Sequence, residues 1–217
     1  LFGIPHDESL ALTSLEPVLR DPRRNFLHDY LGLEEDKKLP LTPDCADLPY
    51  TLRAYFAWKV GLPVAYRACN RGSATSPPRC SAPSIMSEFV RNTPSPTQVT
   101  RFSRQLVDAV HSGSARTSLS DESSDLYPLP LDRNHLWPGT VYADPYGHVL
   151  VLVEWVPQTA DRPGMLLAVD AQPDNSVTRK RVWEGTLLFA DTDNAGPGFK
   201  AFRPLVPASA NRWRVLT

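Results

Sequence analysis

The chain has 217 residues, with 23 Lys or Arg and 24 Asp or Glu, so its formal net charge is −1. A charge this close to neutral argues against a nucleic-acid partner, because nucleic-acid-binding domains are usually basic. No apolar run reaches the ~18 residues of a membrane-spanning helix, so we expect no membrane span. The length fits one domain, 1–217, with a core of its own.

Two short helices are expected at the start of the chain. Residues 9–19 place four leucines near one face, and residues 23–31 continue the pattern after a break at Asp21 and Pro22. We therefore expect residues 1–38 to form a helical N-terminal extension. The charged run at its end, residues 34–38, is interpreted as solvated surface.

A buried helix is predicted to follow Asp44. Gly61 supplies a C-terminal cap for it, with Pro63 just beyond. The apolar residues at helical spacing are Leu48, Leu52, Tyr55, Phe56 and Val60. Cys45 is then expected at the N-terminus of this helix, or one residue inside it. Pro49 falls early in the helix, where its missing N–H should leave a carbonyl near Cys45 unpaired.

The middle of the chain, residues 66–135, is expected to form a loop-rich helical insertion. Residues 97–112 carry an apolar stripe and predict a helix, and residues 83–91 predict a shorter one. Residues 69–81 and 112–125 are rich in Ser, Pro, Asn or Asp and are interpreted as surface loops.

From Pro138 onward the apolar period changes to that of strands. Residues 140–143 and 148–155 flank the turn sequence Asp144-Pro145-Tyr146-Gly147 and predict a β-hairpin. Because 148–155 is apolar on both faces, it should lie in the middle of its sheet. Further strands are predicted at 165–169, 178–183 and 199–202. Helices followed by an antiparallel sheet form an α+β domain.

Cys45 is the first candidate for chemistry. A thiol at a helix N-terminus meets the positive end of the helix dipole and unpaired N–H groups, and both favour the thiolate. The same N–H groups can hold an oxyanion during acyl transfer. The alternative is that Cys45 is a small buried apolar residue at the start of a helix.

A thiolate nucleophile needs a base, and the base needs an orienting group. His148 opens the central strand after a tight turn, where its side chain can reach a cleft. If the strand that ends at Asp170 pairs with it antiparallel, Asp170 lies beside His148 and can orient the ring. Three alternatives stay open: His148 bonds only to solvent, His135 is the base instead, or Asp170 begins the turn at 171–175.

Short motifs around these residues resemble those of bacterial transglutaminase-like cysteine peptidases. The run Asp44-Cys45-Ala46-Asp47, a helix, and then Gly61-Leu62-Pro63-Val64 is similar to that family's Asp-Cys-x-Asp and Gly-Ile-Pro. Gly147-His148-Val149-Leu150-Val151 and Leu167-Ala168-Val169-Asp170 are similar to its Gly-His-x-x-Leu and strand-ending Asp. The resemblance covers mainly 44–64 and 139–183.

This resemblance implies a papain-like fold, in which N-terminal helices, one of them carrying Cys45, pack on a C-terminal antiparallel sheet. It also implies a triad with Cys45 as nucleophile, His148 as base and Asp170 as orienting group. The NlpC/P60 cell-wall peptidases are similar in the second half, through Leu136-Trp137-Pro138-Gly139 and Gly147-His148-Val149. That family has Ser-Gly after Asp-Cys, where this chain has Ala46 and Asp47.

The function implied by the resemblance is thiol-dependent acyl transfer on an amide bond, by a peptidase, an amidase or a transamidase that needs no cofactor. The expected substrates are peptide or protein amides, and peptidoglycan peptides are the first choice for a bacterial cell-envelope protein. The rival hypothesis is a non-catalytic binding or scaffold module on the same fold, with a buried and inert Cys45.

No metal site is expected from the sequence. The spacing of cysteines and histidines does not suit zinc. Residues 191–196 are similar to a calcium loop, but Ala195 stands where an oxygen ligand is needed and no closing Glu follows, so they are interpreted as a turn.

Cys69 and Cys80 flank a loop that has little apolar content to order it. We expect a disulfide between them, which leaves Cys45 as the single free thiol. A disulfide indicates an oxidising compartment, and hence a periplasmic or secreted protein. The alternative is three reduced cysteines in a cytosolic protein.

Overall fold

The computed structural model describes residues 6, 10–37, 39–73, 75–76, 78–92, 94–117, 123–144, 147–182, 196–210 and 212–217. Its main element is a seven-stranded sheet in the order β1-β8-β7-β6-β5-β9-β4, in which all neighbours are antiparallel. The strands are β1 Ala11–Leu12, β4 Leu126–Pro128, β5 Val141–Ala143, β6 Val149–Val156, β7 Met165–Ala171, β8 Val177–Val182 and β9 Gly198–Phe202. Two small hairpins pair β2 Val64–Tyr66 with β3 Ser84–Met86, and β10 Leu205–Ser209 with β11 Arg212–Val215.

Strand β6 is the centre of the sheet, with three strands on each side, as its two apolar faces predict. Val151 and Val153 join the larger core, whereas Leu150 and Leu152 join a second core on the other face. The predicted β5–β6 hairpin is confirmed, with Val141 paired to Val151. Residues 145 and 146 of its turn lie outside the described residues.

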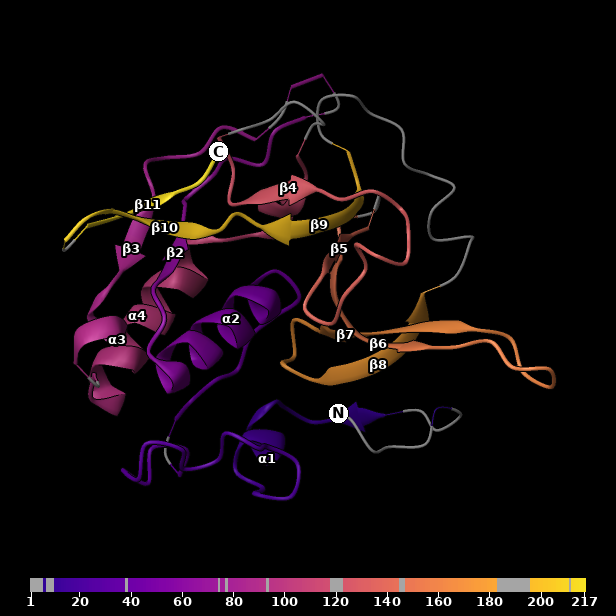
Figure 1. Ribbon diagram of the computed structural model, residues 1–217, viewed down its shortest axis with the longest axis horizontal. Helices are drawn as coiled ribbons and strands as arrows, with labels where there is room; N and C mark the ends of the chain where they lie inside the picture. The colour runs from indigo at the N-terminus through magenta and orange to yellow at the C-terminus, as the bar shows by residue number, and fades with distance from the viewer. Residues whose placement is uncertain are drawn as a thin grey trace.

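The helices are α1 Glu16–Leu19, α2 Asp47–Val60, α3 Glu88–Arg91 and α4 Pro96–Ala109, followed by a 3₁₀ helix, η1, at Ser112–Ala115. In Figure 1, α2, α3 and α4 gather on one side of the molecule and β6, β7 and β8 lie on the other. Helix α2 ends as predicted at Gly61, whose φ of 70° is left-handed. Helix α4 begins with a capping box between Ser95 and Gln98 and ends three residues earlier than predicted, because Val110 is extended.

The mixture of helices and antiparallel strands fits the predicted α+β class. None of the helices in the described ranges is long and apolar enough to cross a bilayer.

The helices predicted at 9–19 and 23–31 are wrong. Ala11–Leu12 is strand β1, and only Glu16–Leu19 is helical, because Pro17 can occupy the first turn of a helix but not its interior. Residues 23–31 form turns, since the side chain of Asn25 accepts a hydrogen bond from the N–H of Leu27. Such local side-chain bonds compete with helix formation.

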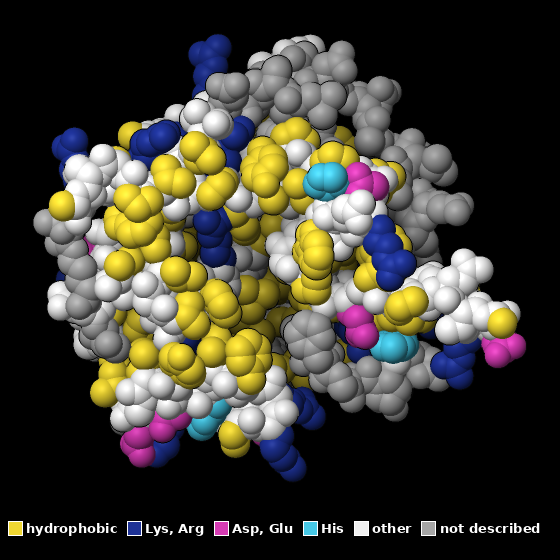
Figure 2. Space-filling model, in the orientation of Figure 1, with side chains coloured by type: hydrophobic (Ala, Val, Ile, Leu, Met, Phe, Trp, Pro, Cys, Tyr) yellow, Lys and Arg dark blue, Asp and Glu magenta, His cyan; other side chains and the backbone are white. Residues whose placement is uncertain are grey.

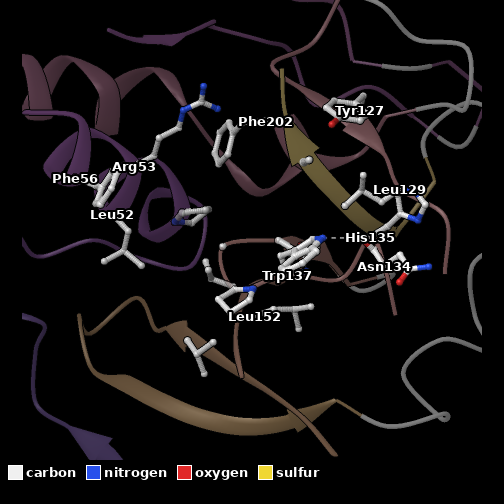
Figure 3. A pocket seen from close by; sticks show the side chains of 17 residues that line it. Leu52, Arg53, Phe56, Tyr127, Leu129, Asn134, His135, Trp137, Leu152 and Phe202 are labelled. Carbon is white, nitrogen blue, oxygen red and sulfur yellow. Dashed lines mark hydrogen bonds between the residues drawn. The ribbon is translucent and has the colours of Figure 1, made fainter. Parts of the chain in front are cut away.

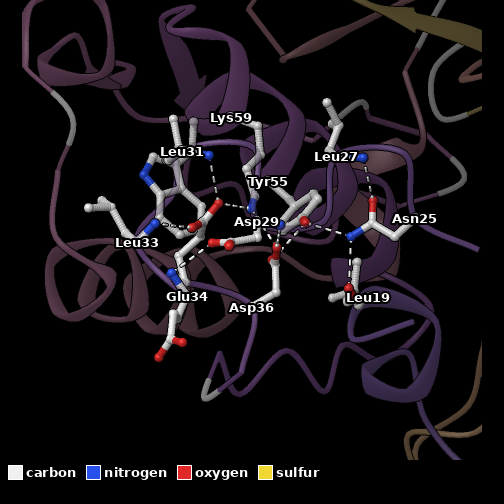
Figure 4. A network of polar contacts seen from close by, with 12 residues as sticks. Leu19, Asn25, Leu27, Asp29, Leu31, Leu33, Glu34, Asp36, Tyr55 and Lys59 are labelled. Carbon is white, nitrogen blue, oxygen red and sulfur yellow. Dashed lines mark hydrogen bonds and ion pairs between the residues drawn. The ribbon is translucent and has the colours of Figure 1, made fainter. Parts of the chain in front are cut away.

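The charged run that follows is buried in part, contrary to its interpretation as solvated. Lys59 of α2 is fully buried and pairs with Glu35 and Asp36. Asp36 also accepts a hydrogen bond of 2.7 Å from the Tyr55 hydroxyl, and Glu35 accepts the N–H groups of Leu31 and Leu33. Figure 4 shows this network between the N-terminal segment and α2. Residues 10–37 are therefore fastened to α2, and their Leu15, Leu19 and Leu27 belong to the larger core.

The middle of the chain contains strands as well as helices. Residues 84–86 form β3 within the range predicted as a short helix, and only 88–91 are helical there. Strand β4 joins the edge of the main sheet by pairing with β9. The predicted disulfide between Cys69 and Cys80 is present, and Cys45 is the free cysteine.

Candidate active site

The Cys45 thiol lies in the turn that leads into α2. The regular helix begins at Asp47, but the N–H of Leu48 already donates to the carbonyl of Asp44 at 3.0 Å. The delay has a chemical cause: Pro49 has no N–H to give to the Cys45 carbonyl, which is the bond that the sequence indicates should be missing. Cys45 is half-buried at this position.

A reciprocal cap holds this turn in place. The Asp44 carboxylate accepts the N–H groups of Ala46, at 2.8 Å, and of Asp47, at 3.1 Å. The Asp47 carboxylate in turn accepts the Asp44 N–H at 3.4 Å. The predicted oxyanion donors are the unpaired N–H groups at the helix N-terminus, and those of Ala46 and Asp47 are not among the free ones. The N–H of Cys45 makes no hydrogen bond within the part of the chain that the structure describes, so it is the donor left for a bound group.

His148 and Asp170 meet where neighbouring strands begin and end. His148 directly precedes β6, and Asp170 is the penultimate residue of β7. Because β6 and β7 are antiparallel, with Val151 opposite Val169, the end of β7 lies beside the start of β6. The His148 Nε2 atom lies 2.5 Å from Asp170 Oδ2. This bond occupies Nε2 and leaves Nδ1 as the ring nitrogen available to the thiol.

The electrostatic environment keeps both groups charged near neutral pH. The hydrogen bond to Asp170 and the hydrogen-bonding contact with Cys45 raise the pKa of His148 from 6.5 to about 9, against the opposing effect of burial. Burial raises the pKa of Asp170, but hydrogen bonds from His148, Lys180 and Thr178 outweigh it and lower this pKa to about 2. Cys45 and Asp170 therefore both act on the charge of His148.

Three further residues surround Asp170, which is fully buried. Thr178 and Lys180 of β8 donate to it, and Gln172 donates from its side-chain amide at 3.0 Å. Asp170 lies opposite Thr178 in the register of β7 and β8. Thr178 and Lys180 were not predicted as site residues from the sequence. Their alternation in the predicted strand was the available signal, because residues two apart on a strand share one face.

The other histidine considered as a base, His135, lies elsewhere. Its Nδ1 is 2.8 Å from both carboxylate oxygens of Asp132, and both side chains are about half exposed. His135 lines a groove that includes none of Cys45, His148 and Asp170 (Figure 3). The residue whose pKa responds to Cys45 is His148.

Among the described residues, no group of three or more His, Cys, Asp or Glu side chains could hold a metal ion. Residues 191–195 of the calcium-like sequence lie outside the described residues. Comparisons with protein-family models, with curated proteins and with solved structures gave no significant match.

Proposed function

We propose that this protein performs thiol-dependent acyl transfer on amide bonds, as a cysteine peptidase, amidase or transamidase. The observation that carries the proposal is the series Cys45, His148 and Asp170, in which the entry to α2, the start of β6 and the end of β7 each supply one residue. A nucleophile, a base and an orienting acid in this order are the elements of a catalytic triad.

In the proposed reaction the Cys45 thiolate attacks the carbonyl carbon of an amide, and the carbonyl electron pair moves to oxygen. The free N–H of Cys45 can donate to that oxyanion. When the carbonyl re-forms, the carbon–nitrogen bond breaks and the leaving amine takes the proton of His148. Water or a second amine then attacks the thioester, gives a proton to His148 and releases the thiolate. Water yields a carboxylic acid, and an amine yields a new amide.

Asp170 has a positioning role in this scheme. Its carboxylate holds the ring of His148 through Nε2, which leaves Nδ1 to exchange a proton with the thiol, and it stabilises the imidazolium form. Thr178, Lys180 and Gln172 hold the carboxylate in turn. This arrangement supports a base that is fixed before substrate binds.

The same features support the papain-like assignment and an extracytoplasmic location as parts of the proposal. A helix that carries the nucleophile packs against an antiparallel sheet that carries the base, since Tyr50 and Ala54 of α2 share a core with Val151 and Val153 of β6. The Cys69–Cys80 disulfide favours an oxidising compartment, such as the periplasm or the cell exterior. Peptidoglycan peptides are the first substrates to test.

Alkylation of the native protein tests whether the thiol is activated. Because Cys69 and Cys80 are joined, iodoacetamide should modify Cys45 alone. We expect Cys45 of the native protein to react faster at neutral pH than the same thiol in the urea-unfolded protein, because the neighbouring His148 activates it. A native thiol that reacts no faster than the urea-unfolded protein at each pH would contradict the proposal and favour the non-catalytic binding module.

Turnover is tested with peptidoglycan peptides in the presence and absence of a primary amine. Mass spectrometry distinguishes hydrolysed peptides from amine adducts, and the Cys45→Ala variant is the control. Products that form equally with Cys45→Ala would exclude Cys45 as the nucleophile.

A further inference from the structure

A groove of about 810 Å³ lies between α2 and the strands, apart from the proposed catalytic residues. Its volume falls within the range of cavities that hold small molecules. Figure 2 shows a hollow in this face of the molecule with hydrophobic side chains around it. In Figure 3, α2 forms one side of the groove and the indole of Trp137 stands in the middle of the view.

One face of α2 lines the groove. Pro49, Leu52, Arg53 and Phe56 follow the spacing of residues on a single helix face. They span about 10 Å along the helix axis. Leu152 of β6 contributes from the sheet. The lining is therefore an apolar strip long enough for a chain or ring system.

Large apolar side chains are left exposed along this strip. Phe56 is 45% exposed and Trp137 is 66% exposed, although eight of the fourteen other aromatic residues in the described ranges are buried. The Trp137 ring is held in place, because its indole N–H donates to the Asn134 carbonyl at 2.6 Å. A fixed aromatic ring with an exposed apolar face is suited to contact an apolar ligand.

The charge of the groove is positive. Among the described residues, no Asp or Glu side chain lines it, whereas Arg53 does. The Arg53 guanidinium lies 4.4 Å from the centre of the Phe202 ring and donates to the Arg203 carbonyl at 3.2 Å. Asp125, the carboxylate whose charge acts on Arg53, already bonds to the Tyr50 hydroxyl and the Arg67 N–H. Arg53 therefore offers further N–H donors and a partly compensated positive charge to an anion.

We propose that this groove is a binding site for a small amphipathic anion, an apolar chain or ring system that carries one carboxylate. The apolar body lies along Leu52, Phe56 and Trp137, and the carboxylate pairs with Arg53. In the part of the lining that the structure describes, the other ionisable side chains belong to Tyr127 and to His135, which is already paired with Asp132. The charge of Arg53 thus selects an anion over a neutral or cationic ligand of the same shape.

Isothermal titration calorimetry with sodium decanoate tests the proposal, with decan-1-ol as the uncharged ligand of the same length. We expect saturable binding of decanoate. Arg53→Gln should weaken it about tenfold, as expected for the loss of a charge-assisted bond, and should leave decan-1-ol binding unchanged. Arg53→Lys should restore part of the affinity. Arg101→Gln, which removes an exposed charge on α4, is the matched control and should have no effect.

Trp137→Ala tests the apolar wall, and Leu131→Ala is its control, since Leu131 is similarly exposed but does not line the groove. Trp137→Ala should weaken both ligands and Leu131→Ala neither. The proposal is overturned if decanoate does not bind saturably, or if Arg53→Gln and Arg101→Gln have equal effects. Binding should persist in Cys45→Ala, so the outcome is separate from that of the proposed acyl transfer.

Discussion

His148 Nε2 lies 2.5 Å from Asp170 Oδ2, and this contact joins the start of the central strand to the end of its neighbour. The Asp170 carboxylate is fully buried, whereas the His148 side chain is 26% exposed. The pair is therefore anchored in the sheet at one end and open to solvent at the other. That is the arrangement a base needs, because its orienting group must stay fixed while its ring exchanges protons.

The order in which variants lose thiol reactivity tests the roles of the residues in the proposed triad. His148→Ala should lower the alkylation rate of Cys45 near pH 7 by about 10²-fold, since it removes the charged partner of the thiol. Asp170→Asn should lower it less, because the imidazole remains. His135→Ala is the matched control and should leave the rate unchanged. If His135→Ala lowers the rate and His148→Ala does not, the base has been wrongly assigned.

The His148–Asp170 pair should shape the dependence of stability on pH. The pKa of His148 is raised from 6.5 to about 9, so its contribution is complete below pH 6.5 and is lost as the pH rises through about 9. The pKa of Asp170 is lowered from 3.8 to about 2, so its contribution is complete above pH 3.8 and is lost as the pH falls through about 2. Urea unfolding should therefore show the full contribution of the pair to the free energy of unfolding between pH 3.8 and pH 6.5.

The His148→Gln variant tests the part of that pH dependence that is assigned to His148. It should flatten the decline between pH 6.5 and 9, where the wild-type protein loses at most about 3 kcal/mol from this residue. A decline of equal size in the variant would show that other groups cause it.

Asp47 should cost stability at neutral pH. Burial, and then the nearby Asp44 carboxylate, raises the pKa of Asp47 from 3.8 to about 7. The folded state is thus favoured below pH 3.8 and loses that advantage as the pH rises through about 7. Asp47→Asn keeps an acceptor for the Asp44 N–H and removes the charge, so it should stabilise the protein by about 1 kcal/mol or more at pH 8. Asp161→Asn, at an exposed position, should change the free energy of unfolding little.

The disulfide should be measurable both as a thiol count and as stability. Denatured, unreduced protein should show one titratable thiol, that of Cys45. The double variant Cys69→Ser/Cys80→Ser should unfold with a free energy about 3 kcal/mol lower, because the open loop gains freedom in the unfolded state. Cys45→Ser keeps the bridge and is the control. A count of three thiols would exclude both the bridge and the oxidising compartment inferred from it.

The elements that could be predicted from the sequence are those whose signal is local. The α2 pattern with its Gly61 cap and the apolar run of β6 are each specified within about fifteen residues. The prediction of N-terminal helices failed because residues distant in the sequence determine the conformation of that segment. Ala11 pairs with Thr178, and Asp36 pairs with Lys59. Periodicity carries no information about such partners.

Some residues of the candidate site could likewise be predicted from the sequence, and others could not. Cys45, His148 and Asp170 could be placed from motif order and from one antiparallel pairing. Thr178 and Lys180 depend on the exact register of a second pairing, between β7 and β8, which alternation alone leaves open by whole residues. The occupied N–H groups of Ala46 and Asp47 depend on the rotamer of Asp44, which no sequence pattern specifies.

The buried Lys59 has a consequence for where the chain can be cut. A fragment that began at residue 39 would keep the Lys59 ammonium group of α2. It would lose both carboxylates that pair with this group, those of Glu35 and Asp36. An unpaired interior cation typically costs several kcal/mol, a large part of the total stability of a domain. Residues 10–37 are therefore part of the folded domain, and a shortened protein made for expression has to begin before them.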